Sequence, residues 1–109
     1  MKKALPPKQL INHIEPQSVL YLTGDANYSR IHLMNGTVFL SAYTLKWFAQ
    51  KWPEFLRPHK QALVNPAYIH RLQVAASLRS QSYVVMQDQV QLPISRRRVP
   101  VMLFQLGRA

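Results

Sequence analysis

The sequence contains no cysteine, only three glycines and only four acidic residues. Without cysteine the chain forms neither a disulfide framework nor a thiolate metal site, which is typical of proteins from a reducing cytosol. No apolar run is long enough to span a bilayer, and no signal-peptide pattern follows Lys2 and Lys3. We therefore expect a cytoplasmic protein with no membrane segment.

The sequence has 14 lysines and arginines but only four acidic residues, which gives a formal net charge of +10 and a pI near 10.6. Such an excess of one sign repels itself in the folded monomer unless a polyanion shares the field. Nucleic acid is the leading partner, because each phosphate that a cation neutralises releases condensed counterions and so favours binding. An anionic membrane surface is the second. With 109 residues and 48% hydrophobic content, the chain can bury a core of its own.

Residues that carry catalysis or hold metals do not gather in the sequence. The acids are Glu15, Asp25, Glu54 and Asp88, and the histidines are His13, His32, His59 and His70. The acids are scattered, and the histidines show none of the spacings of metal ligands. No glycine-rich phosphate loop or nucleophile elbow is present. We therefore expect no enzyme, no cofactor, no metal site and no small-molecule substrate.

The chain divides into a basic, proline-containing leader or linker over residues 1–17 and one domain over residues 18–109. In the leader, Leu10, Ile11 and Ile14 could dock on the domain as a short helical turn. In the domain, apolar patterning predicts strands over 19–23, 29–33, 38–41, 69–75, 82–86 and 90–94, with a short extended piece at 55–57. Asn35-Gly36 predicts a tight hairpin turn, since both residues accept positive φ.

Two or three short helices complete this mainly β fold. Thr44 as N-cap, an apolar face recurring at helical spacing and Pro53 predict a helix over 43–52. Its aromatic residues and the one that follows, Trp47, Phe48, Trp52 and Phe55, are interpreted as core and not as stacking platforms. Asn65-Pro66 predicts a single helical turn. A terminal helix is expected within 95–106, where Pro100 either kinks the helix or lies in its first turn and leaves the arginines in a loop ahead of it.

Arg96, Arg97 and Arg98 are the sharpest local feature. At a helix start their charges oppose the positive end of the helix dipole, which costs roughly a few tenths of a kcal/mol for each charge. Arginine also has the planar fork that reads guanine edges or clamps phosphate. The cluster therefore indicates an anionic partner; a solvated basic run is the alternative.

Two further polar segments are suited to binding. The segment 55–65 brings Arg57, His59, Lys60 and Gln61 together between apolar anchors, as insertion into a groove requires. Alternatively, the His59 ring bonds to the backbone and fixes the loop. In the segment 25–30, Asn27 can read adenine, Tyr28 can reach a phosphate and Arg30 projects from the polar face of its strand. Alternatively, this segment is turn chemistry and Tyr28 belongs to the core.

Taken in order from Ser18 to about Met102, these segments resemble the LytTR family of bacterial transcription regulators. Two motifs carry the resemblance, Phe55-x-Arg57-x-His59-Lys60-x-x-Leu63-Val64-Asn65 and Leu92-Pro93-Ile94-Ser95-Arg96-Arg97-Arg98. The resemblance implies an elongated fold of packed antiparallel β-sheets with short helices. It also implies binding to repeated sites on double-stranded DNA, through loops placed in successive major grooves, with a homodimer on DNA as one arrangement.

By the same resemblance, base edges are assigned to Asn27, Lys60 and Arg97. Phosphate contacts or loop positioning are assigned to Arg30, His59, Arg96 and Arg98, with Tyr28 and Gln61 beside them. Gln61 stands where the family often has a small hydroxyl residue, and Pro100 interrupts a terminal helix that is usually continuous. The alternative function is a basic RNA-binding or protein-interaction β module, and RNA readers rely on exposed aromatic side chains.

Overall fold

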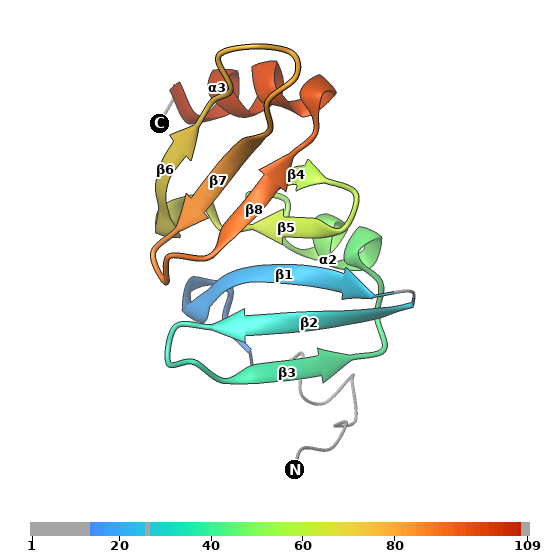
Figure 1. Ribbon diagram of the computed structural model, residues 1–109. Coiled ribbons are helices and arrows are strands. Elements are labelled where there is room, and N and C mark those ends of the chain that lie inside the picture. The colour runs from blue at the N-terminus through green and yellow to red at the C-terminus, as the bar shows by residue number, and fades with distance from the viewer. Residues whose placement is uncertain (1–13, 26, 108–109) are drawn as a thin grey trace.

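A computed structural model describes residues 14–25 and 27–107 of the chain (Figure 1). Its elements, in chain order, are the 3-10 turn η1 (Pro16–Ser18), strands β1 (Val19–Asp25), β2 (Tyr28–Leu33) and β3 (Val38–Ser41), helix α2 (Leu45–Lys51), strands β4 (Leu56–His59) and β5 (Ala62–Val64), the 3-10 turn η2 (Pro66–Tyr68), strands β6 (Ile69–Gln73), β7 (Ser82–Met86) and β8 (Gln91–Ile94), the 3-10 turn η3 (Arg96–Arg98) and helix α3 (Val99–Gly107).

The strands form two antiparallel sheets. The first has the order β3-β2-β1-β5-β4, and the second has the order β6-β7-β8. The molecule is elongated, with principal extents of 43 × 27 × 24 Å, and the sheets follow one another along its length (Figure 1). The predicted class, an elongated and mainly β fold of packed antiparallel sheets with short helices, is confirmed.

Strand β1 is the centre of the first sheet and is covered on both of its faces. Leu20 and Tyr21 belong to a core cluster shared with the second sheet and α3, whereas Val19 and Leu22 belong to a cluster under α2. All four side chains are at most 6% exposed. A strand that is buried on both faces needs an unbroken apolar run, which residues 19–22 supply. The two core clusters therefore meet at this strand.

Helix α2 packs its apolar face against the first sheet, as its spacing predicts. The Thr44 hydroxyl accepts a hydrogen bond of 3.2 Å from the Trp47 backbone N–H, which confirms the predicted N-cap. Phe48 is fully buried and Trp52 almost so. Trp47 stacks on Tyr43 with ring centroids 4.0 Å apart. The aromatic residues of this helix are therefore part of the core.

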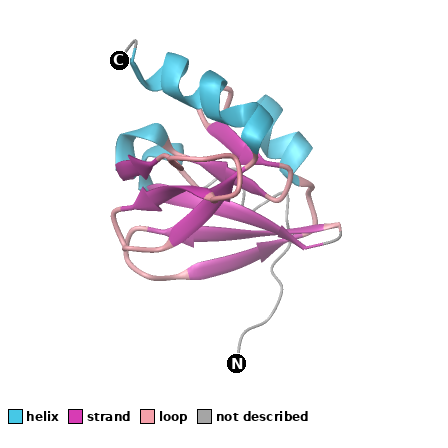
Figure 2. Ribbon diagram, turned by 45° about the horizontal axis from the view of Figure 1, so that its top comes forward, coloured by secondary structure: helices cyan, strands magenta, loops and turns pink. Residues whose placement is uncertain are grey.

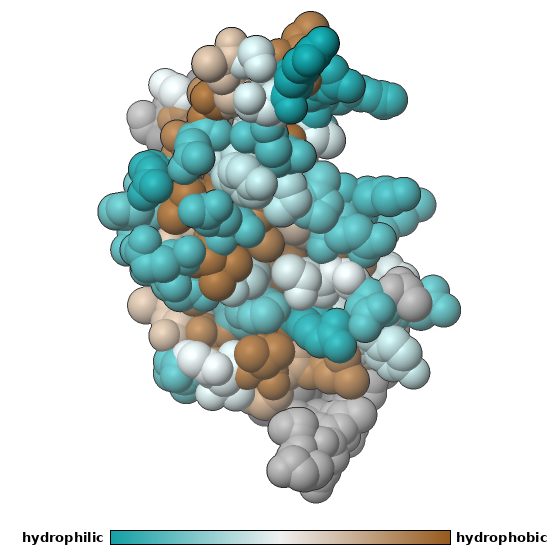
Figure 3. Space-filling view, in the orientation of Figure 1, coloured by the Kyte–Doolittle hydropathy of each residue, from teal (hydrophilic) through white to brown (hydrophobic). Residues whose placement is uncertain are grey.

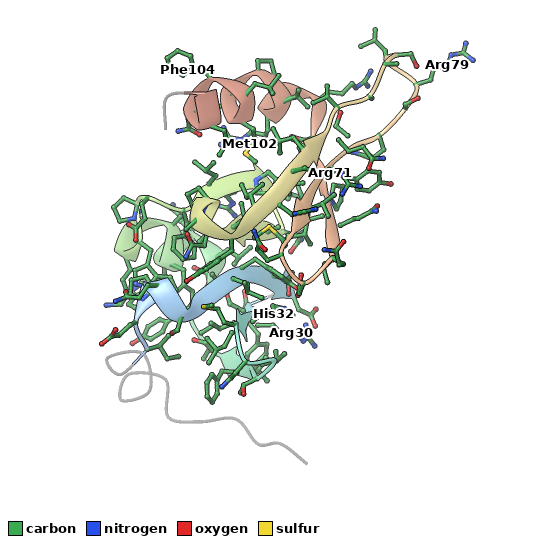
Figure 4. All side chains as sticks on the ribbon, turned by 90° about the vertical axis from the view of Figure 1, so that its left-hand side faces the viewer. Arg30, His32, Arg71, Arg79, Met102 and Phe104 are labelled. Carbon is green, nitrogen blue, oxygen red and sulfur yellow. The ribbon has the colours of Figure 1, made fainter. Side chains whose placement is uncertain are left out.

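Helix α3 lies over the second sheet and closes the first core cluster (Figure 2). Met102 points from α3 into the body of the molecule, whereas Phe104 points away from it (Figure 4). Pro100 is the second residue of α3, where its missing N–H does no harm. Of the two predicted outcomes, the second is correct. The α-helix begins only at Val99, and the three arginines form a 3-10 turn ahead of it.

The turns occur at the predicted positions, but the backbone conformation of one of them differs from the prediction. Between β2 and β3, only Gly36 has positive φ, at 90°, and Asn35 instead accepts a hydrogen bond of 2.9 Å from the Thr37 backbone N–H. The turn therefore follows the pattern in which glycine alone takes the left-handed conformation. Asn65 caps η2 by accepting a bond of 3.0 Å from the Ala67 N–H, as predicted.

Several strand predictions need correction. Strand β1 extends to Asp25 and not to 23, and the extended piece expected at 55–57 is strand β4, which covers Leu56–His59. Strand β6 ends at Gln73 and not at 75. Val90 lies outside β8, after Gln89, whose φ of 72° makes the turn; it is 37% exposed and so does not share the buried face of Leu92 and Ile94. The segment 62–64, which no pattern classifies, is strand β5. Its three residues are too few for a period to register, and they become a strand by pairing with β1 and β4.

The predicted leader lies mostly outside the described residues, including Leu10 and Ile11. Ile14 packs against the core cluster under α2. The Asn65 amide donates to the carbonyl oxygen of Pro16 at 3.1 Å, and the Tyr68 hydroxyl donates to that of Gln17. Residues 14–17 are therefore held to the domain. In the described part of the chain, no helix has the length and apolar character of a membrane span.

Candidate nucleic-acid interface

The first predicted loop joins β1 to β2. Asn27 is exposed there, and Tyr28 is 51% exposed. The Tyr28 side chain therefore does not belong to the core, and that alternative is wrong. Arg30 Nη1 lies 3.0 Å from Asp25 Oδ2, with both side chains about half exposed. An exposed ion pair of this kind contributes little stability, so the Arg30 guanidinium can exchange Asp25 for another anion at small cost.

The second loop joins β4 to β5 and is stiffened from within. The backbone N–H of Gln61 donates to His59 Nδ1 at 3.1 Å, and Arg57 Nη2 donates to the carbonyl oxygen of Lys60 at 2.9 Å. The His59 ring therefore bonds to the backbone and fixes the loop, as one of the two predicted roles requires. Burial, and then the nearby Arg57, lower the pKa of His59. The Lys60 and Gln61 side chains are exposed.

The third loop is η3 with Ser95 ahead of it. Arg96 and Arg97 are exposed, whereas Arg98 is half-buried. The backbone N–H of Arg98 donates to the carbonyl oxygen of Ser95 at 2.9 Å and closes the turn. The turn runs directly into α3 at Val99, so the three arginines lie immediately ahead of the positive end of that helix dipole. The three charges stay adjacent on one tight turn.

The second and third loops are joined directly. The backbone N–H of Ser95 donates to the carbonyl oxygen of Pro58 at 2.9 Å, and Arg98 Nε donates to that of Arg57 at 2.9 Å. Together they line a surface hollow of about 870 Å³, whose walls are Arg57, His59, Lys60, Gln61, Ser95, Arg96, Arg97 and Arg98. Five of these residues are cationic and none is acidic. The hollow is thus suited to an anion of extended shape.

The first loop is joined to the second through Gly24. Its backbone N–H donates to the carbonyl oxygen of Gln61 at 2.8 Å. A Cβ at Gly24 would lie 3.0 Å from Gln61 Oε1 and 3.0 Å from Leu45 Cδ1, so a larger residue here requires these side chains to shift. All three loops lie along one edge of the molecule (Figure 1), where hydrophilic side chains project at three heights (Figure 3). The nine predicted site residues are therefore brought to one edge.

Sequence reasoning did not assign a role to the residues that hold this edge together. Gly24, Arg57 and Ser95 are not among the predicted DNA-facing residues, yet each makes a bond between or within the loops. Arg57 carried a signal, because a charged residue between Leu56 and Pro58, both buried, has to have a local partner. Among the described residues, no group of three histidine or acidic side chains is placed to hold a metal ion.

The structure is thus a β module of two antiparallel sheets, one following the other, with a cationic edge formed by coupled loops. The sequence model of the LytTr DNA-binding domain matches residues 9–106, so the chain belongs to the LytTR family of DNA-binding domains. A LytTr DNA-binding domain from Bacillus cereus has a similar solved structure, with a TM-score of 0.74 at 20% identity, over 86% of this chain and 85% of that one. No curated protein matches the sequence.

Proposed function

We propose that this chain binds double-stranded DNA sequence-specifically, by inserting its three loops into the major groove, and that it regulates transcription in a bacterium. The observation that carries the proposal is the hollow between the second and third loops, which is lined by five cations and no acid. In protein–DNA complexes, cations of this kind bind phosphate oxygens or the acceptor-rich edge of guanine. The family membership supports DNA as the anion.

The predicted site side chains fall into two groups, those that are exposed to solvent and those that already bond to the protein backbone. Asn27, Lys60 and Arg97 are exposed at the three loops and are the proposed base readers. Arg98 and His59 already bond to the backbone of the second loop, so their proposed part is mainly to position it. Arg30, Arg96, Tyr28 and Gln61 are proposed to contact the DNA backbone or to flank the base readers.

The length of the molecule suits more than one groove. Successive major grooves on one face of DNA lie roughly 34 Å apart, and the long axis of the domain is 43 Å. The loops lie at different heights along that axis (Figure 1). As the resemblance to the family implies, we propose loops in successive major grooves and binding to repeated sites, with a second copy on the neighbouring repeat as a homodimer on DNA.

The competing reading, an RNA-binding module, finds less support. RNA readers stack unpaired bases on exposed aromatic rings. Here Phe48, Trp52 and Phe55 are buried in the core, and Tyr28 is the aromatic residue that stands exposed at a described loop of the edge.

A salt titration on matched nucleic acids tests the proposal. The best duplex is first selected from randomised DNA with the full chain, and binding is then measured for that duplex, its single strand and the RNA of the same sequence. The expected result is preference for the duplex and a log–log salt slope of roughly −0.9 for each phosphate contacted. Tighter binding to either single strand, or a flat salt response, would refute it.

A further inference from the structure

Arg57 occupies a central position in the cationic edge without being one of its exposed side chains. Its Nη2 donates to the carbonyl oxygen of Lys60 at 2.9 Å, within the second loop. Its own carbonyl oxygen accepts from Arg98 Nε at 2.9 Å, from the third loop. The next carbonyl oxygen, of Pro58, accepts from the Ser95 N–H. The Arg57 side chain thus restrains the second loop, and the backbone carbonyl oxygens of Arg57 and Pro58 hold the third loop against it.

The geometry of the guanidinium suits this role better than any other cation would. A planar fork that donates to a fixed backbone oxygen holds the peptide on one side of the loop, whereas a lysine ammonium holds it only as a point charge. On the other side of the same turn, His59 Nδ1 accepts from the Gln61 N–H at 3.1 Å. The side chain of Lys60 leaves the loop between these two restraints.

The arrangement carries a cost that stability alone does not explain. Arg57 Nε is buried and has no hydrogen-bond partner among the described residues. A buried N–H without an acceptor destabilises a fold. A role in placing neighbouring side chains accounts for the presence of this arginine.

We infer that Arg57 is a positioning residue: by holding the Lys60 carbonyl oxygen, its side chain sets the direction in which the Lys60 side chain extends toward its base pair. This inference rests on the proposed function. It makes a residue that touches no base a determinant of sequence preference, because the direction of the Lys60 side chain follows from the position of its backbone.

The test uses the full chain, the selected duplex and its single-base variants, and it begins with Lys60→Ala, which identifies the base pair that Lys60 reads. Arg57→Met should then lower discrimination at that same base pair by roughly tenfold, the size expected for one lost direct contact. The melting temperature should change little, because loss of the bond to the Lys60 carbonyl oxygen is offset by removal of the unpartnered Arg57 Nε. Arg57→Lys, which keeps the charge, should lose part of the discrimination and little affinity for a scrambled duplex.

A double-mutant cycle separates positioning from a general effect. In the Lys60→Ala background, Arg57→Met should cause no further loss at that base pair. Arg71→Met is the matched control, because Arg71 lies on β6 outside the hollow (Figure 4). Arg71→Met should leave discrimination between base pairs unchanged and alter only the salt dependence of binding. Discrimination that survives both Arg57 variants, losses that multiply in the cycle, or a Lys60→Ala variant without an affected base pair would overturn the inference.

The inference and the proposed function fail in different ways. If Arg97→Ala and Asn27→Ala change base preference while Arg57→Met and Arg57→Lys do not, then the loops read DNA and only the inference is wrong. If none of these variants changes base preference, groove reading itself is wrong. If Arg57→Met does not fold, the decision falls to Arg57→Lys, whose charge and size leave the fold intact.

Discussion

Arg98 Nε donates a hydrogen bond of 2.9 Å to the carbonyl oxygen of Arg57, across 41 positions of sequence. The bond connects the arginine turn at the end of the second sheet to the loop at the edge of the first sheet. It also gives Arg98 a partner within the protein, so this arginine differs from Arg96 and Arg97 on the same turn. Three adjacent arginines thus have unequal parts.

Removing Arg98 should therefore affect the fold as well as binding. Arg98→Ala should lower the free energy of unfolding by about 1 kcal/mol, because one intramolecular hydrogen bond is lost. Arg96→Ala is the control, since its exposed side chain makes no such bond, and its unfolding free energy should stay within about 0.5 kcal/mol of the parent. Chemical denaturation of both variants without DNA provides the measurement. Equal values for the two would show that the Arg98 bond contributes nothing.

The contact between the first and second loops should depend on glycine. Gly24→Ala puts a methyl group 3.0 Å from Gln61 Oε1 and Leu45 Cδ1, and should cost about 1–3 kcal/mol of stability if neither side chain can move away. Gln61→Ala removes one of the two obstacles, so the same substitution in that background should cost less. Thermal unfolding of the four proteins of this cycle checks it. An additive result would mean that the contact with Gln61 does not restrain the loop.

Helix α2 should act as scaffold and not as a recognition helix. Phe48→Ala should destabilise the domain by about 3–5 kcal/mol, because the ring is fully buried and its removal leaves a cavity. Lys46 is exposed on the same helix, and Lys46→Ala should leave base preference intact. Denaturation and binding to the single-base variant duplexes check the two substitutions. A change of preferred base in Lys46→Ala would place this helix in a groove and contradict the arrangement of loops.

Stability without DNA should fall in mild acid, partly through His59. Burial and then Arg57 lower the pKa of this imidazole in the folded state, whereas an unfolded histidine titrates near pH 6.5. The unfolded state therefore binds more protons below about that pH, and the free energy of unfolding falls as the pH drops through it. His32, whose pKa burial also lowers, adds in the same direction.

His59→Asn should remove its share of this dependence and make the plot of stability against pH shallower below about pH 6.5. His32→Asn serves as the comparison, because it lies in the first sheet and not at the second loop. Urea denaturation at several pH values between about 5.5 and 7.5 measures both. An unchanged or steeper slope in His59→Asn would show that its folded-state pKa is not lowered.

The sequence predicts the parts of this fold that local chemistry determines. The Thr44 cap, the Asn65-Pro66 turn and the hairpin at Asn35-Gly36 each depend on residues within a few positions, so their patterns can be read directly. Strand β5 has three residues and forms because β1 and β4 lie on either side of it. Its assignment depends on pairing across the sheet, which no local pattern contains.

The site divides in the same way. Resemblance to a family locates the exposed Asn27, Lys60 and Arg97, because motifs record which side chains face outward. Two bonds position these loops, from Gly24 to Gln61 and from Arg98 to Arg57, and they join residues 37 and 41 positions apart. Because every residue has a backbone carbonyl, the sequence does not indicate which one accepts such a bond. The resemblance therefore supplies the candidate base readers, and the structure is needed to find the bonds that position them.

The central claim is that the edge reads bases and does not only attract phosphate, and the Arg97→Ala variant tests it most directly. A bidentate arginine–guanine contact contributes about 1–3 kcal/mol of discrimination against the wrong base. Binding of parent and variant is measured on the selected duplex and on a scrambled one at the same salt concentration. The account predicts that the ratio of the two affinities falls by roughly tenfold or more in Arg97→Ala, with preference relaxed at one base pair. Equal losses on both duplexes would contradict it, because Arg97 would then be only one more positive charge.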